Sequence, residues 1–281
     1  MAGDSSGSFN PRVIGAVIIA AIIGFIAFWV LSAFAPNHSS GNDGAPHALS
    51  RSAISYSALL RLLEAGGAQA EVDRGGENPP NAFIILTPNA GTSAKDLEEA
   101  MVRHGGRRML IILPKWRTVA DPRHPGWVRA AGELAASETQ SMLPAAWQLS
   151  MVEQRYQSSP NMEAWLLNDP IRISLPSGAR GFGGSHPSAL WVEGRTLIAR
   201  VHDRSDLMVT VEPDLFNNQG IATPERAQQA VTIIQTLSRG APIRFDVTLT
   251  GHGAAESIPK LACEPPFLGL TICLLFATLL A

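Results

Sequence analysis

Hydrophobic residues gather in two short runs in the first half of the chain. Residues 82–87 (AFIILT) and 109–113 (MLIIL) are apolar throughout, which is typical of strands buried on both faces of a parallel sheet. Between them, Ser93 and Asp96 have the spacing of a capping box and predict a helix that runs to about His104. Strand, helix and strand with short connections indicate a right-handed βαβ unit, and so an α/β fold.

Other patterned segments extend this prediction. Residues 52–65 carry their leucines on one helical face, and Pro224 suits the first turn of a helix that ends near Gly240. Residues 243–249 alternate between inward and outward positions, which predicts an edge strand. Further strands are expected at residues 69–72, 171–175, 189–192, 196–201 and 207–212, and Glu193 and Gly194 predict a tight turn between the strands at 189–192 and 196–201.

Residues 115–160 are less regular, and we interpret them as an insertion on the sheet. They contain Trp116, Trp127 and Trp147, and a helix is expected over about residues 127–137. The tryptophans could form a contact surface, although core packing is the expectation for at least two of them.

Long apolar segments lie at both ends of the chain. Residues 13–34 carry no charge and predict a transmembrane helix over residues 13–35, with a cleaved signal peptide as the alternative. The C-terminal run is short for a span. We interpret residues 264–281 as the start of a second transmembrane helix cut at Ala281, with a re-entrant or interfacial piece as the alternative.

These segments predict an integral protein of the inner or plasma membrane. Arg12 abuts the first span, so the positive-inside rule places residues 1–12 in the cytoplasm. Residues 36–50 are polar and rich in Gly and Ser, which predicts a flexible tether. Residues 51–263 would then form a periplasmic or extracellular domain.

Charge and cysteine content exclude several classes of protein. The chain has 22 Lys and Arg against 24 Asp and Glu, so we expect no nucleic-acid partner. Cys263 and Cys273 lie at the apolar C-terminal end and form no Cys-x-x-Cys pair, which excludes a thiolate zinc site. No cofactor is predicted.

The sequence contains no familiar catalytic motif. It has no P-loop and no His-Glu-x-x-His helix, and the segment around Ser185 lacks the last glycine of a nucleophile elbow. His202, Asp203 and Asp206 lie close in sequence and resemble metal ligands, but polar residues are ordinary between two strands, so we predict no metal site. We therefore predict that the protein is not an enzyme.

The strongest candidate site is the polar segment after the strand at residues 207–212. Ligands of open α/β sheets bind at the carboxyl ends of strands, so Asp214, Asn217 and Asn218 could face a ligand or partner. The alternative is that these side chains only satisfy loop and cap amides.

Several short motifs, in this order, resemble one family. They are YSAL at 56–59, LLEAG at 62–66, TP at 87–88, EPDLFNNQG at 212–220, FDVTL at 245–249 and EPPFL at 264–268. With the N-terminal apolar segment, they make the chain similar to the domain-of-unknown-function family 4350, membrane-anchored proteins with a glutamine-amidotransferase-like fold.

The resemblance implies a Rossmann- or flavodoxin-like three-layer sandwich with a mainly parallel sheet, and a second membrane helix followed by a cytoplasmic tail. It also implies a membrane complex with a MoxR-type AAA ATPase. Amidotransferase chemistry needs a cysteine nucleophile at a strand-to-helix turn. Here residues 109–113 lead into Pro114, Lys115 and Trp116, so the fold would be kept without the nucleophile.

The predicted function is a non-enzymatic, membrane-anchored domain that binds a partner protein or small ligand. Its expected partners are the lipid bilayer and proteins of a membrane complex, including the AAA ATPase. Two alternatives stay open. One is a divergent hydrolase or transferase that uses His202, Asp203 or Asp214, and the other is an accessory subunit of a transporter.

Overall fold

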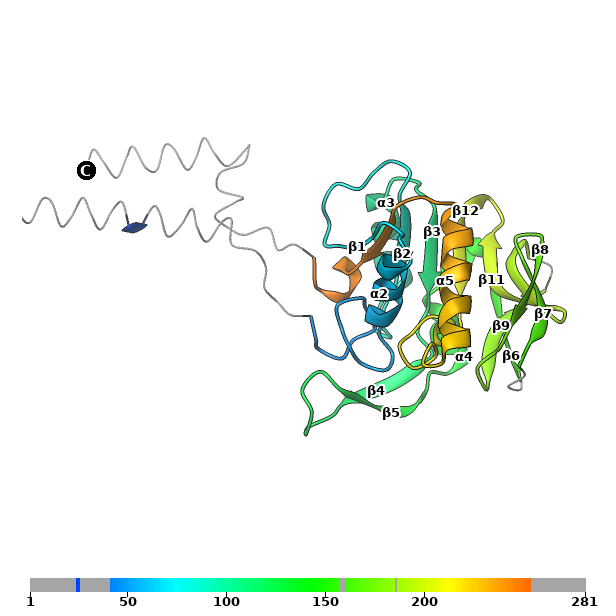
Figure 1. The fold of residues 1–281 in the computed structure, drawn as a ribbon, viewed down its shortest axis with the longest axis horizontal. Helices are drawn as coiled ribbons and strands as arrows, with labels where there is room; N and C mark the ends of the chain where they lie inside the picture. The colour runs from blue at the N-terminus through cyan, green and yellow to red at the C-terminus, as the bar shows by residue number, and fades with distance from the viewer. Residues whose placement is uncertain (1–23, 26–40, 157–159, 185, 254–281) are drawn as a thin grey trace, which may run out of the picture. The chain divides into compact units, whose positions relative to one another are not determined.

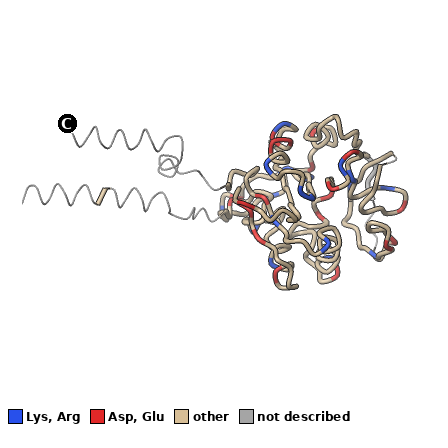
Figure 2. The backbone as a smooth tube through the Cα atoms, turned by 90° about the horizontal axis from the view of Figure 1, so that it is seen from above, with Lys and Arg blue, Asp and Glu red and all other residues tan. Residues whose placement is uncertain are grey.

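The computed structural model describes residues 24–25, 41–156, 160–184 and 186–253 (Figure 1). Apart from Gly24 and Phe25, these residues lie in a unit that spans residues 39–254. Acidic and basic residues are interspersed along the described part of this unit (Figure 2).

The structure corrects the membrane prediction. Among the described residues, no helix has the length and apolar character needed to cross a membrane. The helices expected at residues 13–35 and 264–281 fall outside the described residues, apart from Gly24 and Phe25. The predicted globular domain is present.

A mixed sheet of eleven strands organises the unit, and few helices accompany it. Across the sheet the strands are β1 (Ala70–Asp73), β13 (Ile243–Asp246), β2 (Phe83–Leu86), β3 (Met109–Ile112), β12 (Arg204–Thr210), β11 (Arg195–Val201), β10 (Ser188–Val192), β7 (Met162–Leu166) and β8 (Asp169–Ile173). In addition, β9 (Ala179–Gly183) pairs with β11, and β6 (Ser150–Tyr156) pairs with β9.

The sheet has a parallel half and an antiparallel half. The first five strands, β1 to β12 in this order, are parallel to one another, and the other six described strands pair antiparallel. The prediction of a Rossmann- or flavodoxin-like sandwich with a mainly parallel sheet is therefore wrong. More than half of the sheet is an antiparallel extension, which such a sandwich lacks.

Helices cover both faces of the parallel half. α2 (Ser57–Ala65) and α5 (Pro224–Ser238) pack together on the face that includes Ile85 (Figure 1). α3 (Ala94–Arg103) packs on the opposite face, which includes Ile84. Because successive strand residues point to opposite faces, both faces of β2 and β3 must be apolar, as their sequences are.

The predicted βαβ unit is confirmed as β2, α3 and β3, with its two strands parallel neighbours. The Ser93 hydroxyl accepts a hydrogen bond from the Asp96 backbone N–H, and the Asp96 carboxylate accepts one from the Ser93 backbone N–H. This reciprocal pair is the capping box that the sequence predicted.

The predicted edge position of residues 243–249 is wrong. β13 lies inside the sheet, between β1 and β2, and pairs parallel with both. The alternating pattern suggested an edge strand because it contains a charged residue, Arg244. In the structure this side chain is only partly exposed, and it lies 3.3 Å from a Glu71 carboxylate oxygen on the neighbouring strand β1. Only β1 separates β13 from this edge of the sheet.

A tight turn joins β10 to β11 in the antiparallel half. Glu193 and Gly194 both have positive φ, 43° and 83°, which suits a two-residue hairpin turn. The sequence prediction for this turn is therefore confirmed.

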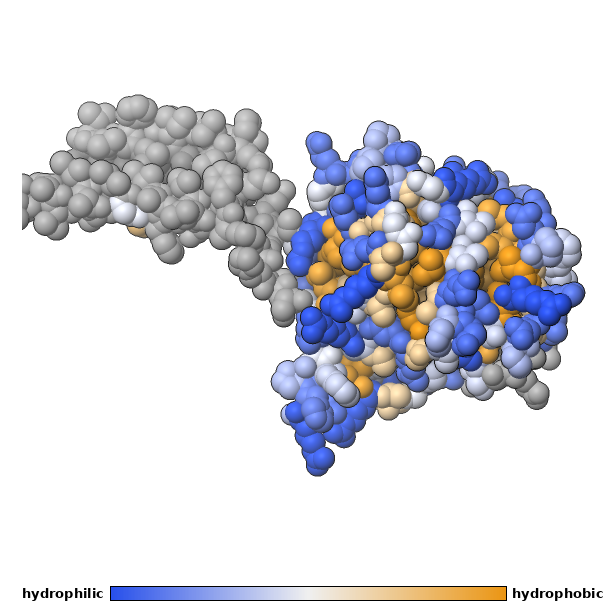
Figure 3. Space-filling model, in the orientation of Figure 1, coloured by the Kyte–Doolittle hydropathy of each residue, from blue (hydrophilic) through white to orange (hydrophobic). Residues whose placement is uncertain are grey.

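The predicted insertion contains a separate two-stranded ribbon. β4 (Trp116–Ala120) pairs antiparallel with β5 (Val128–Glu133), and the short helix α4 (Ala136–Ser141) follows. The helix expected over residues 127–137 is wrong, because residues 128–133 gain their backbone hydrogen bonds from β4 instead. The free end of the ribbon is hydrophilic (Figure 3).

The three tryptophans of this region have different environments. Trp147 ends the single-turn 3-10 helix η1 (Ala145–Trp147) and is buried in the core beside α3. Trp127 is 64% exposed, and Trp116 is partly buried. The predicted core packing therefore holds fully for Trp147 alone.

Candidate functional site

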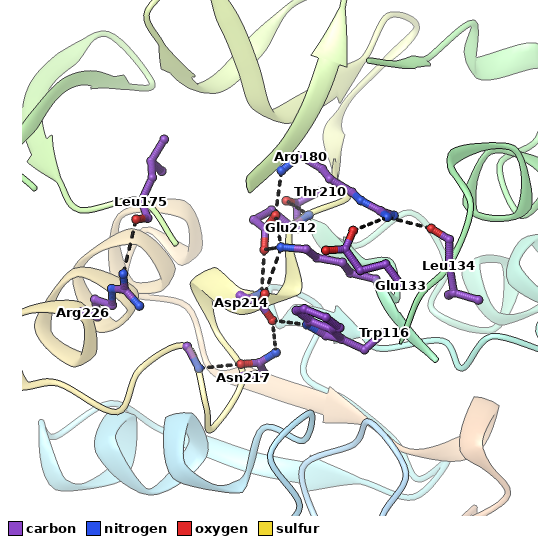
Figure 4. Close-up of polar contacts among 12 residues, drawn as sticks. Trp116, Glu133, Leu134, Leu175, Arg180, Thr210, Glu212, Asp214, Asn217 and Arg226 are labelled. Atoms are coloured by element: carbon purple, nitrogen blue, oxygen red, sulfur yellow. Dashed lines mark hydrogen bonds and ion pairs between the residues drawn. The ribbon is translucent and has the colours of Figure 1, made fainter. Parts of the chain in front are cut away.

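A buried lysine forms the centre of the candidate site. Lys115 follows β3, and none of its surface is exposed. Its Nζ lies 3.0 Å from each of Glu212 Oε1, Glu212 Oε2 and Asp214 Oδ2 (Figure 4). An ammonium group has three N–H donors, so these contacts engage all of them.

Strand order explains how these residues meet. β3 and β12 are parallel neighbours, so their carboxyl ends lie side by side. Lys115 comes shortly after β3 and Glu212 shortly after β12, although 97 residues separate them in sequence. The topology therefore places opposite charges within hydrogen-bonding distance at one edge of the sheet.

Hydrogen-bond donors surround the Glu212 carboxylate. Besides Lys115, the Arg180 backbone N–H donates to Oε2 at 2.7 Å, and the Asp214 backbone N–H donates to Oε1 at 3.2 Å. Burial raises the pKa of Glu212 to about 8; the Lys115 ammonium opposes this rise, and the Asp214 carboxylate adds to it. The side chain is thus held in place by four contacts.

Asp214 connects the lysine to the neighbouring loop. It lies in the 3-10 turn η2 (Pro213–Leu215), and its Oδ1 accepts hydrogen bonds from Trp116 Nε1 at 2.7 Å and Asn217 Nδ2 at 2.6 Å. Asn217 Oδ1 in turn accepts the Gly220 backbone N–H at 2.7 Å. Both carboxylate oxygens of Asp214 are therefore engaged, and the indole ring of Trp116 is fixed.

A cleft of about 330 Å³ opens beside this network. Its apolar lining residues are Ala45, Pro46, Ile54, Ala90, Pro114, Ala120, Val128 and Pro213, and its polar ones are Asp43, Tyr56, Asn89, Lys115, Arg117, Thr118 and Asn217. The inner face of β4, with Trp116, forms one wall. The volume falls at the lower end of the range for small-molecule sites.

The hydroxyl of Tyr56 forms no hydrogen bond within the described part of the chain. The residue is 1% exposed, and it lines the cleft. Burial raises the pKa of this hydroxyl, and the carboxylates of Asp214 and Glu212 add to the rise. The phenol therefore keeps its proton and presents an unused donor at the cleft.

The structure separates the three predicted site residues. Asp214 and Asn217 meet in one network at the cleft, as described above. Asn218 points elsewhere: its Oδ1 accepts the Ala58 backbone N–H at 2.9 Å, and its Nδ2 donates to Ser52 O and Ser55 Oγ, both at 2.8 Å. Asn218 thus caps α2, which matches the alternative that it satisfies cap amides.

No family model, curated protein or solved structure matches this chain. The resemblance to the 4350 family, and the AAA ATPase partner that it implies, therefore stay predictions. The site has to be interpreted from its own chemistry.

Sequence reasoning missed Lys115, Trp116 and Glu212 as site residues. One signal in the sequence could have indicated Lys115, which is a charged residue shortly after the fully apolar strand β3. Residues that follow neighbouring parallel strands lie at the same edge of the sheet, and Glu212 and Asp214 follow β12. What the sequence could not supply was that β3 and β12 are neighbours, since nearly a hundred residues and several strands separate them.

The residues first considered as metal ligands are not brought together. Asp206 is exposed and lies 3.6 Å from Arg108, and His202 and Asp203 join no group of potential ligands among the described residues. Two other groups do converge: Asp43 with His47 and His252, and Asp73 with His104 and Asp246.

The second group is buried and internally satisfied. His104 Nε2 lies 2.5 Å from Asp246 Oδ2, and its Nδ1 lies 4.0 Å from Asp73 Oδ2. Asp73 also accepts hydrogen bonds from Gly75, Gly76 and Asn78. The two ring nitrogens face different carboxylates, so this group joins the ends of β1 and β13 to α3 rather than presenting three ligands to one ion.

Proposed function

We propose that this domain binds a small, largely apolar molecule that carries a hydrogen-bond acceptor, in the cleft beside Lys115. The observation that carries this proposal is the position of Tyr56, which lines the cleft and whose hydroxyl forms no hydrogen bond with another described residue. An acceptor on the ligand could pair with this hydroxyl, and one such polar contact in a mostly apolar cleft fixes the orientation of the ligand.

The walls of the cleft support an apolar ligand. Proline, isoleucine and valine side chains line it, and Trp116 adds an aromatic surface. The hydrogen bond from Trp116 Nε1 to Asp214 holds the ring before any ligand arrives. A fixed aromatic wall favours binding because less side-chain freedom is lost on association.

The polar floor supports binding rather than covalent catalysis. A catalytic amine must be free to attack, but the Lys115 ammonium is engaged by Glu212 and Asp214. Asp214, a candidate in the alternative hydrolase hypothesis, has both oxygens occupied. The network therefore supports a structural role beneath the cleft.

A screen by ligand-observed NMR tests this proposal. The purified protein would be mixed with small aromatic and aliphatic carbonyl compounds, and each hit would be titrated into wild type, Tyr56→Phe and Trp116→Leu. Loss of one neutral hydrogen bond in Tyr56→Phe should weaken binding by roughly 3- to 10-fold. Trp165→Leu removes an equally large ring from β7, outside the cleft lining, and should leave binding unchanged.

Two outcomes would overturn the proposal. One is a screen in which no compound binds the wild-type protein. The other is a set of hits that bind Tyr56→Phe and Trp116→Leu as tightly as wild type while Trp165→Leu loses them.

A further inference from the structure

Two histidines from distant parts of the chain converge on Asp43, which lines the cleft. His47 Nε2 lies 2.9 Å from Asp43 Oδ1, and His252 Nε2 lies 2.9 Å from Asp43 Oδ2. One potential ligand atom from each residue lies within 4.8 Å of the other two. His252 and Asp43 are 209 residues apart in sequence, so the fold alone creates this arrangement.

We propose that Asp43, His47 and His252 bind a divalent transition-metal ion, with zinc as the ion to test first. Two imidazole nitrogens and a carboxylate oxygen are a donor set that suits zinc and ferrous iron. Zinc bonds to such donors at roughly 2.0–2.2 Å, so small side-chain rotations would bring three ligand atoms onto one ion.

The backbone around these residues is anchored before any ion binds. The His47 carbonyl accepts the Ser50 and Tyr56 backbone N–H groups, both at 3.3 Å. The His252 backbone N–H donates to Val247 O at 3.0 Å, and its carbonyl accepts from Arg74 Nη1 at 3.2 Å. Such supporting contacts orient metal ligands and raise the affinity of a site.

The two imidazole rings pack closely and both face Asp43. Their centroids are 4.4 Å apart, and their planes are inclined at 61°, so the rings meet edge to face. With both Nε2 atoms directed at Asp43, an ion between them would replace two hydrogen bonds by three metal–ligand bonds.

The surroundings of His47 disfavour its charged form, and the neutral imidazole is the form that binds metals. The residue is fully buried, and burial lowers its pKa, although the Asp43 carboxylate opposes this shift. Its Nδ1 accepts the Leu49 backbone N–H at 3.2 Å, so the ring proton lies on Nε2. Coordination through Nε2 moves that proton to Nδ1 and gives up the long contact with Leu49, a cost that moderates the affinity.

Access distinguishes this group from the buried Asp73 group. The Asp43 side chain is 45% exposed and also lines the cleft, so an ion could enter from solvent. Positions not filled by protein ligands would then be open to water or to a ligand. The inference rests on these three residues and not on the small molecule proposed above.

Zinc titration of the full chain tests this site. Zinc would be titrated against a chromogenic chelator with wild type, His252→Gln and Asp43→Asn, and folding of each variant would be checked by circular dichroism. We expect one zinc ion per wild-type chain that each variant binds at least about tenfold more weakly. Cobalt in place of zinc adds a second readout, because its visible absorption reports the coordination geometry.

The chain provides a matched control. His124 Nδ1 lies 3.3 Å from Asp121 Oδ2 on the β4–β5 connection. His124 is exposed and Asp121 is partly buried, and among the described residues neither belongs to a group of three potential metal ligands. His124→Gln should bind zinc like wild type. Equal zinc affinity in wild type, His252→Gln and Asp43→Asn would overturn the proposal, as would no zinc binding by wild type at micromolar concentrations.

Discussion

Lys115 Nζ lies 3.0 Å from both carboxylate oxygens of Glu212, and neither side chain exposes any surface. Two opposite charges have therefore been removed from water together at the junction of β3 and β12. Attraction within such a pair offsets desolvation only when further hydrogen bonds complete it. Asp214 and the Arg180 backbone N–H supply those bonds.

Removing the lysine should strongly destabilise the fold. Lys115→Met leaves Glu212 and Asp214 buried without a counter-charge, and breaking a buried pair in this way costs about 3–5 kcal/mol. Chemical denaturation at pH 9, above the raised pKa of Glu212, would measure the loss. Lys95→Met is the matched control, since the Lys95 side chain is 83% exposed, and it should leave the free energy of unfolding nearly unchanged.

The same variant should show a pH dependence of known sign. The pKa of Glu212 is raised from 4.5 to about 8, so between these values the folded protein holds a proton that the unfolded chain releases. Falling pH therefore favours the folded state at this site, and more so without the opposing charge of Lys115. The loss in free energy of unfolding caused by Lys115→Met should therefore be smaller at pH 5 than at pH 9. A loss of equal size at both pH values would contradict this account.

Asn218→Ala should cost stability but not ligand binding. The change removes the acceptor for the Ala58 N–H and the donor to Ser52 and Ser55, a loss of about 1–2 kcal/mol. Thermal or chemical denaturation would measure this loss of stability, and Asn81→Ala, at an exposed position, is the control. Weaker ligand binding by a folded Asn218→Ala protein would instead place this residue in the site.

Gly220 is required by a close backbone approach. A Cβ at this position would lie 1.7 Å from the Asp214 carbonyl oxygen, so Gly220→Ala must displace the turn that carries Asp214. We expect a loss of about 1–3 kcal/mol or more. Gly91→Ala meets only the Asn89 side chain, at 3.7 Å, and should be tolerated. Equal stability of the two variants would show that the turn at Asp214 is not tightly held.

The buried His104–Asp246 contact should contribute to stability at neutral pH and lose its effect in acid. Burial raises the pKa of Asp246, but hydrogen bonds from His104 and Thr248 outweigh this and lower it below 3.8. The contribution is therefore present above pH 3.8 and is lost as pH falls through the lowered pKa. Asp246→Asn should be less stable than wild type at pH 6 and approach it below pH 3.8, whereas exposed Asp206→Asn should match wild type throughout.

Local patterns predicted the local elements well. The apolar runs gave β2 and β3, the Ser93–Asp96 spacing gave the cap of α3, and Glu193–Gly194 gave a tight turn. Each of these depends on residues close in sequence. The strand β5 was mistaken for a helix because its hydrogen-bond partner, β4, comes from a segment with no strand signal of its own.

Long-range pairing could not be predicted in the same way. The parallel strands suggested a Rossmann-like sheet. In the structure the sheet continues beyond β12 with β11, β10, β7 and β8, which are antiparallel and come earlier in the chain, and nothing in the sequence of β12 indicates this order. The candidate site had the same difficulty. Asp214 and Asn217 were found from their position after a strand, whereas Lys115 and Glu212 became partners only once β3 and β12 were neighbours.

Fluorine NMR of protein labelled with 5-fluorotryptophan tests the central claim most directly. The six tryptophans include Trp116 in the cleft, and Trp165 and Trp191 on the exposed face of the antiparallel strands. Assignment by single Trp→Phe variants would identify each resonance. On addition of a hit from the screen, the account predicts that the Trp116 resonance shifts while those of Trp165 and Trp191 do not. A shift confined to Trp165 and Trp191, with Trp116 unchanged, would contradict ligand binding in this cleft.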